Sequence, residues 1–197
     1  MKINAIIYEE IKRNNNMITT AGVTELGFSR AVLTNYVKQG LLERSRQGVY
    51  TLPDAVCDDM YILMLCSEKI IFSHETALFL NGLSERTPFM HAVTIPSNAV
   101  LPKSVKGECI CYYIKPELHD VGVILKKTTL GNTVRCYNAE RTICDILRSR
   151  NRVDEETVVS ANKNYAAYDK KNLNRLSVYA RQFKVAKEVK KYLEVLL

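Results

Sequence analysis

The feature that most constrains the fold is the stretch GFSRAVLTNYVKQGLLERSRQGVYTL, which occupies residues 27–52. It places a short helical segment between two glycines. Gly27 can end a preceding helix and Gly40 the next one, because glycine adopts the left-handed backbone that ends many helices. Ser29 stands where an N-cap is expected for a helix over 30–39. Two helices separated only by the short turn in ELGFSRA are typical of a helix-turn-helix.

A tight hairpin follows this helix. Gln47 and Gly48 stand between two short strand-like runs, and a glycine in the second position suits a two-residue turn. The order of helix, helix, helix and hairpin predicts a winged helix-turn-helix domain over residues 1–54 that binds double-stranded DNA. Apolar spacing and turn residues place its helices over 3–13, 21–26 and 30–39, and its strands over 41–46 and 49–52.

The helix over 30–39 has one apolar and one polar face. Arginine can reach a guanine edge or a phosphate, asparagine an adenine edge, and threonine and lysine further polar groups of DNA. The same unit can instead serve protein contacts, in which case Arg30 and Lys38 are simply solvated. Two wing arginines alternate on one side of the first strand. The candidate DNA-binding residues are Ser29, Arg30, Thr34, Asn35 and Lys38 on the helix, with Arg44, Arg46 and Gln47 on the wing.

The rest of the chain, residues 55–197, is predicted to be an α+β domain that ends in helices. A connecting helix is expected over 55–67 with Asp54 as its cap, and Ser73 is expected to cap the next helix, which Gly82 ends. Asn138 is expected to cap the helix AERTICDILRSR. The remaining elements are strands at 91–95, 108–114, 121–127 and 133–137, and helices from about 154 to 168, over 172–182 and over 185–196.

The chain carries a net charge of +7, and this charge is unevenly distributed. Residues 1–54 are at +2, residues 55–147 at −1 and residues 148–197 at +6. Such an excess favours a DNA-backbone surface, although a solvated face is the ordinary outcome for a run of charge. Lys184, Lys187 and Lys191 are predicted to share one helical stripe. The full candidate surface is Lys163, Lys170, Lys171, Arg175, Arg181, Lys184, Lys187, Lys190 and Lys191.

Other function classes find little support in the sequence. No run reaches the roughly 18 apolar residues of a membrane span, so we expect a cytoplasmic protein with no membrane partner. Six cysteines without a C-x-x-C pair indicate neither a disulfide framework nor a zinc ribbon, and Cys109 and Cys111 are expected in a core. We expect no metal, no cofactor and no catalytic residue. Arg141 and Asp145 are expected to form a structural ion pair.

Two motifs in the middle of the chain, FSHETALFLNGLSERTP at 72–88 and NAERTICDIL at 138–147, resemble the AbiEi family of antitoxins. The similarity extends to the N-terminal TTAGVTELGFSRAVLTNYVKQGLLERSRQGVYTL and to the terminal LNRLSVYARQFKVAKEVKKYLEVL. This family belongs to type IV toxin–antitoxin systems linked to abortive infection by phage. The resemblance implies an autorepressor that binds inverted repeats in its own promoter through the winged helix. A monomer in solution that binds DNA cooperatively is compatible with it.

The resemblance also implies a functional partner, a nucleotidyltransferase-type toxin that the C-terminal domain counteracts without a stable complex. Two alternatives remain open from the residues. One is a nuclease-like or nucleotide-modifying enzyme that reverses the action of the toxin, for which Glu108 and Asp120 are the acids to test. The other is an adaptor that sequesters the toxin by binding it.

Overall fold

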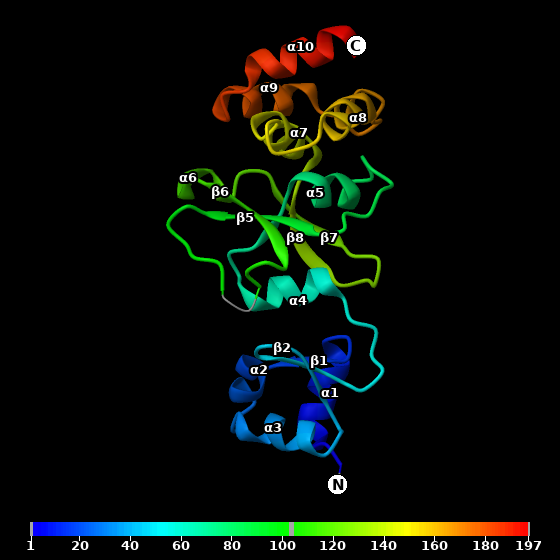
Figure 1. Ribbon diagram of the computed structural model, residues 1–197, viewed down its shortest axis with the longest axis vertical. Coiled ribbons are helices and arrows are strands. Elements are labelled where there is room, and N and C mark those ends of the chain that lie inside the picture. The colour runs from blue at the N-terminus through cyan, green and yellow to red at the C-terminus, as the bar shows by residue number, and fades with distance from the viewer. Residues whose placement is uncertain (1, 103–104, 197) are drawn as a thin grey trace. The chain divides into compact units, whose positions relative to one another are not determined.

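The computed structural model describes residues 2–102 and 105–196, with side chains as far as residue 192. The chain forms two compact units, shown in Figure 1: Met1–Glu68 with Pro102–Val105, and Lys69–Leu101 with Lys106–Leu197. Both units contain helices and strands, so the mixed α+β class expected from the sequence is confirmed. The first unit extends beyond residue 54 and includes the segment up to Glu68.

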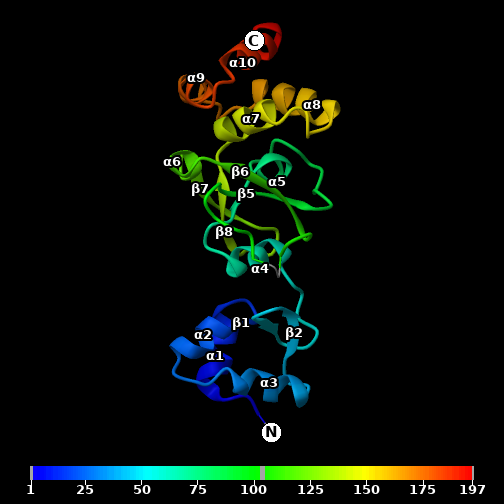
Figure 2. The ribbon, with the colours of Figure 1, turned by 60° about the vertical axis from the view of Figure 1, so that its left-hand side comes forward.

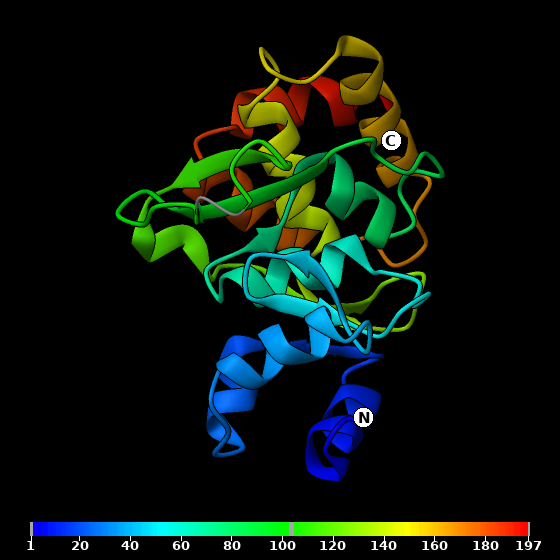
Figure 3. The ribbon, with the colours of Figure 1, turned by 60° about the horizontal axis from the view of Figure 1, so that its bottom comes forward.

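The described residues of the first unit form four helices and a three-stranded sheet, coloured from blue to cyan in Figure 3. The sheet is antiparallel in the order β1-β3-β2, with Met17 opposite Thr51 and Glu43 on the other side of Thr51. The elements in chain order are α1 (Ala5–Arg13), β1 (Met17–Thr19), α2 (Thr20–Glu25), α3 (Ala31–Lys38), β2 (Glu43–Arg46), β3 (Val49–Thr51) and α4 (Asp59–Cys66).

The core of this unit is built from the apolar faces of its helices. Ile7 and Ile11 of α1 are fully buried and pack in one cluster with Val23 of α2 and Leu33 of α3. The hydroxyl of Tyr36 accepts a hydrogen bond from the backbone N–H of Asn4 at 3.0 Å, which connects α3 to the start of α1. The spacing of buried positions on α1 and α3 is therefore the amphipathic pattern that predicted these helices.

Helix α4 differs from its prediction. It begins at Asp59, and its cap is Asp58, whose carboxylate accepts a hydrogen bond from Tyr61 N at 3.2 Å. The expected cap, Asp54, instead lies in a turn with a φ of 59°. The helix belongs to the first unit, where Ile62 packs with Met17 and Val49 of the sheet.

The second unit contains a five-stranded mixed sheet in the order β6-β5-β4-β8-β7. Strand β4 pairs antiparallel with β5 and parallel with β8, β5 pairs parallel with β6, and β7 pairs antiparallel with β8. The strands and the helices before and between them are β4 (Ile71–Phe72), α5 (His74–Leu80), β5 (His91–Pro96), β6 (Cys109–Ile114), α6 (Pro116–His119), β7 (Val123–Lys127) and β8 (Thr133–Tyr137).

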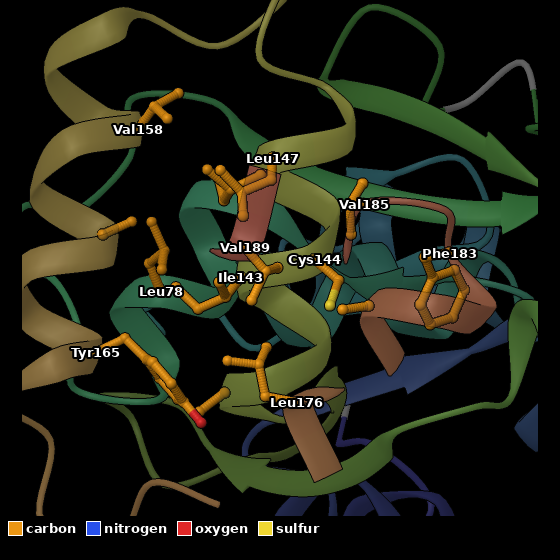
Figure 4. Packing of buried hydrophobic residues seen from close by; sticks show 14 of the residues in the cluster. Leu78, Ile143, Cys144, Leu147, Val158, Tyr165, Leu176, Phe183, Val185 and Val189 are labelled. Carbon is orange, nitrogen blue, oxygen red and sulfur yellow. The ribbon is translucent and has the colours of Figure 1, made fainter. Parts of the chain in front are cut away.

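In the described chain four helices, α7 to α10, follow the last strand. They gather on one side of the five-stranded sheet (Figures 1 and 2). Figure 4 shows how Ile143, Cys144 and Leu147 of the first of these helices meet side chains from the helices around it. Leu78 of α5 belongs to the same cluster, so this core joins the helices to the sheet layer. The helices are α7 (Ala139–Arg148), α8 (Glu155–Ala166), α9 (Leu173–Gln182) and α10 (Ala186–Leu196).

Helix α7 is almost entirely buried. As expected, Asn138 caps it by accepting a hydrogen bond from Arg141 N at 2.9 Å. The predicted structural ion pair is also present: Nε of Arg141 lies 2.9 Å from Oδ2 of Asp145, and neither side chain is exposed. The guanidinium of Arg141 also donates to the carbonyl oxygens of Leu118 and Val121. This one arginine therefore connects α7 both to α6 and to the segment between α6 and β7.

Ser73 precedes α5 but does not cap it with its side chain. Its hydroxyl instead lies 2.9 Å from Nδ1 of His74 and accepts a hydrogen bond from Thr94 at 2.8 Å. Cys109 is buried, whereas Cys111 is partly exposed, and no disulfide joins the six cysteines of the described chain. Among the described residues, no helix has the length and apolar character that crossing a membrane requires.

Candidate nucleic-acid interface

A short turn sets α3 at a fixed angle to α2. The hydroxyl of Thr19 caps α2 by accepting from Gly22 N at 3.0 Å, and Gly27 turns the chain with a φ of 82°. The N–H of Phe28 then donates to the carbonyl of Val23 at 3.0 Å, which closes the end of α2. These bonds satisfy backbone groups at both ends of α2, so the turn that presents α3 is well defined.

Helix α3 begins one residue later than predicted. Arg30 occupies its N-cap position and makes no capping bond with its side chain, while the hydroxyl of Ser29 accepts from Ala31 N at 3.3 Å. Ser29 thus supports the first turn, as its position suggested, without being the cap residue. Arg30 extends from the N-terminal end of the helix, where the helix dipole adds partial positive charge.

The two faces of α3 are divided as the sequence predicted. Leu33 and Tyr36 are buried in the core of the first unit. Helix α3 itself contains no acidic residue, and Lys38 lies in its last turn. The polar face is therefore a positively charged surface rich in hydrogen-bond donors. Its candidate residues, all exposed to solvent, are Ser29, Arg30, Thr34, Asn35 and Lys38.

The wing is less regular than predicted. The pairing of β2 with β3 shifts between Arg44 and Arg46, so the simple alternation of these two arginines on one side is wrong. Arg44 is exposed, whereas the side chain of Arg46 is only 18% exposed and its Nη2 lies 3.7 Å from Oδ1 of Asp59. Gln47 is exposed in the turn, where Gly48 has a φ of 81°. Arg44 and Gln47 are thus the more accessible wing candidates.

Helix α4 contributes to the electrostatics beside the wing. Asp59 neutralises part of the charge of Arg46. Burial, followed by the negative charges of Glu10 and Asp58, raises the pKa of Tyr61, so its phenol stays neutral at ordinary pH. Asp58, Asp59 and Tyr61 belong to α4 or its cap, and Glu10 belongs to α1.

The basic candidates of the second unit are distributed over three helices and the segments between them. Arg175 lies 3.5 Å from the buried carboxylate of Glu140, and Arg181 donates to Ser177. Lys184 precedes α10 and has a φ of 59°, so the predicted stripe of three lysines is wrong: only Lys187 and Lys191 share a helical face. The exposed members are Lys163, Lys170, Arg175, Arg181, Lys184, Lys187, Lys190 and Lys191, and Lys171 is partly buried.

The acids named for the enzyme alternative are far apart. Glu108 immediately precedes β6, whereas Asp120 follows α6, which begins beyond the other end of β6. A six-residue strand spans about 20 Å at the usual rise per residue. Within residues 2–102 and 105–196, no three histidine, cysteine, aspartate or glutamate side chains are grouped as metal ligands would be.

Comparison with known proteins identifies the segment that holds this surface. Residues 6–53 match the AbiEi antitoxin family of transcriptional regulators. The match includes α2, α3 and the hairpin, and it confirms over these residues the AbiEi resemblance seen in the sequence. The AbiEi resemblance of the two middle motifs, 72–88 and 138–147, stays a prediction. No curated protein sequence matches the chain.

Nearly the whole chain shares its fold with a protein of known structure. The crystal structure of the RV2827C protein from Mycobacterium tuberculosis has a TM-score of 0.69 with this chain at 11% sequence identity. The similarity covers 95% of this chain and 75% of that chain. At this identity the likeness shows a shared fold alone, and the AbiEi match remains the finding that bears on function.

The contribution of Asp59 on α4 to the wing was not predicted from the sequence. The ion pair of Arg46 with Asp59 requires α4 to pack on the wing sheet, which neither apolar spacing nor charge pattern signals. The shift in strand register was equally unpredicted, because Ser45 fits a regular strand as well as it fits a bulge.

Proposed function

We propose that this protein is an AbiEi-type antitoxin and transcriptional autorepressor. The AbiEi regulator match over residues 6–53 carries the proposal. In this proposal the first unit is a winged helix-turn-helix, α3 reads base edges in the major groove of double-stranded DNA, and the hairpin contacts the flanking backbone. The target is a set of inverted repeats in its own promoter. The chain acts in the cytoplasm, without a cofactor and without a catalytic step.

The geometry of α3 supports this assignment. Arg30 and Asn35 are exposed on one face while Leu33 and Tyr36 anchor the opposite face in the core. Arginine and asparagine are the side chains that most often make paired hydrogen bonds with guanine and adenine. Because the anchor residues are buried, the polar side chains are held on a rigid element, which base readout requires.

The proposed division of labour assigns affinity to the second unit. Lys187 and Lys191 on α10 would contact phosphates, which adds binding energy without sequence preference. In the antitoxin role, the same unit counteracts a nucleotidyltransferase-type toxin and does not form a stable complex with it. A monomer that binds the repeats cooperatively is consistent with this scheme.

The test is a gel-shift and footprint series with the full chain on DNA from upstream of its own gene. Arg30→Ala and Asn35→Ala should each weaken binding to this DNA by about 1–3 kcal/mol and relax its sequence preference. Arg13→Ala is the matched control, since Arg13 is an exposed arginine on α1 of the same unit. Equal losses for Arg13→Ala and Arg30→Ala, or no loss for either α3 variant, would overturn the assignment of α3.

The second unit needs a separate measurement. Lys187→Ala with Lys191→Ala should weaken binding to all sequences alike and reduce the salt dependence of log K by up to about 0.9 per lost phosphate contact. Lys115→Ala with Lys127→Ala is the control pair, because both lysines are exposed elsewhere in the same unit. An unchanged salt slope for the Lys187→Ala, Lys191→Ala variant would show that these lysines do not contact DNA.

The antitoxin role is tested by growth rescue on co-expression with the adjacent toxin gene.

A further inference from the structure

The second unit carries a groove beside helix α8. It is formed by the loop before β5, by β6, by α5 and by the first turns of α8, and we call it the α8 groove. One part is a hollow of about 290 Å³ whose lining includes Leu78, Pro88, Phe89 and Ile110. A neighbouring hollow of about 620 Å³ shares Leu78, Ser84, Arg86 and Thr157 with it, so the two hollows adjoin.

The first hollow is bordered by apolar side chains that the fold leaves in water. Phe89 is 103% exposed, the highest value among the large hydrophobic residues described, and Ile110 of β6 is 36% exposed. Pro88 and Met90 beside them are partly buried. An aromatic ring held fully in solvent next to a hollow with apolar walls is the arrangement that protein partners use as an anchor point.

Acidic side chains surround this apolar surface. A third, shallow hollow at α8 shares Glu156 and Ser160 with the second and adds Lys163. Across the three hollows, the only basic side chains among the described lining residues are Arg86 and Lys163. The acids of the lining are Glu75, Glu85, Asp154, Glu155, Glu156 and Asp169.

This acidity is opposite to the charge of the surrounding sequence. Residues 148–197 contain twelve basic and six acidic residues. Four of the six acids line the α8 groove, whereas only one of the twelve bases, Lys163, does so. Charge is therefore sorted between faces of the second unit, and the groove is the negative face. A DNA backbone is excluded from this face by repulsion.

Stabilisation of helix α8 accounts for only some of the acids that line the groove. Asp154 caps α8 by accepting from Thr157 N at 2.7 Å and from Thr157 Oγ1 at 2.6 Å, and acids in a first turn favour the helix dipole. Glu75 lies in the first turn of α5 and so has a dipole role there, whereas Glu85 in the loop before β5 lies outside the helices. Burial raises the pKa of Glu75, and its Oε2 has no hydrogen-bond partner among the described residues. A cation seated beside this wall would stabilise the carboxylate.

We infer that the α8 groove docks a polypeptide segment of another protein, in which a bulky apolar side chain is flanked by arginine or lysine. The apolar side chain packs against Phe89 and Ile110, and the basic residues pair with the acidic rim. Charge complementarity favours such a segment. The acidic rim would repel an acidic protein or a nucleic acid, and a purely apolar segment would leave the acids of the rim without partners. The inference does not depend on the proposed DNA binding.

The experiment selects displayed random peptides of about twelve residues against the full chain and measures the selected peptides by fluorescence anisotropy. The recovered peptides should combine arginine or lysine with an aromatic or aliphatic residue, and their affinity should fall as salt is raised. Phe89→Ser, and separately Glu85→Lys with Glu156→Lys, should each weaken binding at least about tenfold.

Two controls match these changes in the same unit. Val178→Ser removes an apolar side chain that is 55% exposed on α9, and Glu117→Lys reverses an exposed acid on α6. Both controls should bind the peptides as the unaltered chain does, and Phe89→Ser should bind promoter DNA normally. Three results overturn the inference: no binding peptide is recovered, the recovered peptides lack basic residues, or they bind Phe89→Ser as tightly as the unaltered chain.

Discussion

Replacement of Arg141 by methionine should destabilise the second unit by about 3–5 kcal/mol, because it leaves the buried carboxylate of Asp145 without its closest partner. Both side chains are fully buried, and their Nε and Oδ2 atoms are 2.9 Å apart. Arg148 also lies 3.2 Å from Asp145, but its side chain is 26% exposed, so it compensates only in part. The loss of the ion pair is therefore the largest expected term.

Further contacts of the guanidinium would be lost with it. Nη1 donates to the carbonyls of Leu118 at 2.9 Å and Val121 at 3.0 Å, and methionine would leave both without this donor. The Cζ atom lies 4.2 Å from the ring centroid of Tyr137 and 3.8 Å from that of Phe183, so two aromatic rings also lose a cation. Methionine fills much of the same volume, which keeps the cavity contribution small.

The assay is urea unfolding of the full chain, followed by circular dichroism, for the two single variants and the double variant. Asp145→Leu alone should also cost several kcal/mol, because it leaves the arginine buried without its carboxylate. The variant that combines both changes should be more stable than the sum of the two losses predicts, since no uncompensated charge remains. The coupling energy from this double-mutant cycle measures the interaction between Arg141 and Asp145.

Arg150→Met serves as the matched control. Arg150 pairs with Glu188 at 3.4 Å, but its side chain is 47% exposed, so the same substitution there should change stability by no more than about 1 kcal/mol. If Arg141→Met costs as little as this control, or if the double variant shows no coupling, the argument that the buried pair organises α7 is refuted.

Two further predictions concern single positions of the second unit. Gly122→Ala should destabilise the second unit more than Gly131→Ala does. Both glycines have a φ above 80°, so the backbone strain is similar. A Cβ at Gly122, however, would lie 2.9 Å from Cβ of Arg141, whereas a Cβ at Gly131 would meet nothing within 4 Å. Thermal unfolding of the two variants compares the clash directly, and equal losses would contradict it. Burial, with the charges of Arg148, Arg141 and Arg152, holds the pKa of His74 well below its ordinary 6.5. As pH falls through 6.5 the unfolded chain gains a proton that the folded chain does not, so stability should decrease by up to about 1.4 kcal/mol per pH unit. His74→Asn, which tolerates the positive φ of this position, should lack this part of the pH dependence, and identical slopes in urea titrations would count against the account.

The long, strongly patterned elements were predictable from the sequence. Strands β5, β6 and β8 and helices α7 to α10 lie within about two residues of their predicted bounds, since apolar periodicity and capping residues such as Asn138 mark them locally. Short elements were not predicted: β1 and β4 contain three and two residues, too few for a period to be recognised. Helix α4 begins later than predicted because Asp58, rather than Asp54, provides the capping carboxylate.

For the candidate sites, features within one element were predictable, and features that combine several elements were not. The polar face of α3 was predictable, because a single helix determines which of its residues share a face. The partner of Arg46 and the acidic rim of the α8 groove were not, because they bring together residues from separate elements. Glu75, Glu85 and Asp169 show no shared pattern in the sequence, and only the packing of α5 and α8 places them around two neighbouring hollows of the α8 groove.

The first unit is made from two separate pieces of the chain, since Pro102–Val105 belongs to it together with Met1–Glu68. Within this second piece, Val105 is fully buried. A recombination event that cut the gene once after Glu68 would therefore transfer an incomplete unit. Homologous exchange of the DNA-reading part between relatives should favour crossovers that carry both pieces, and a fusion protein built from the first 68 residues alone should be less stable than the same unit in the full chain.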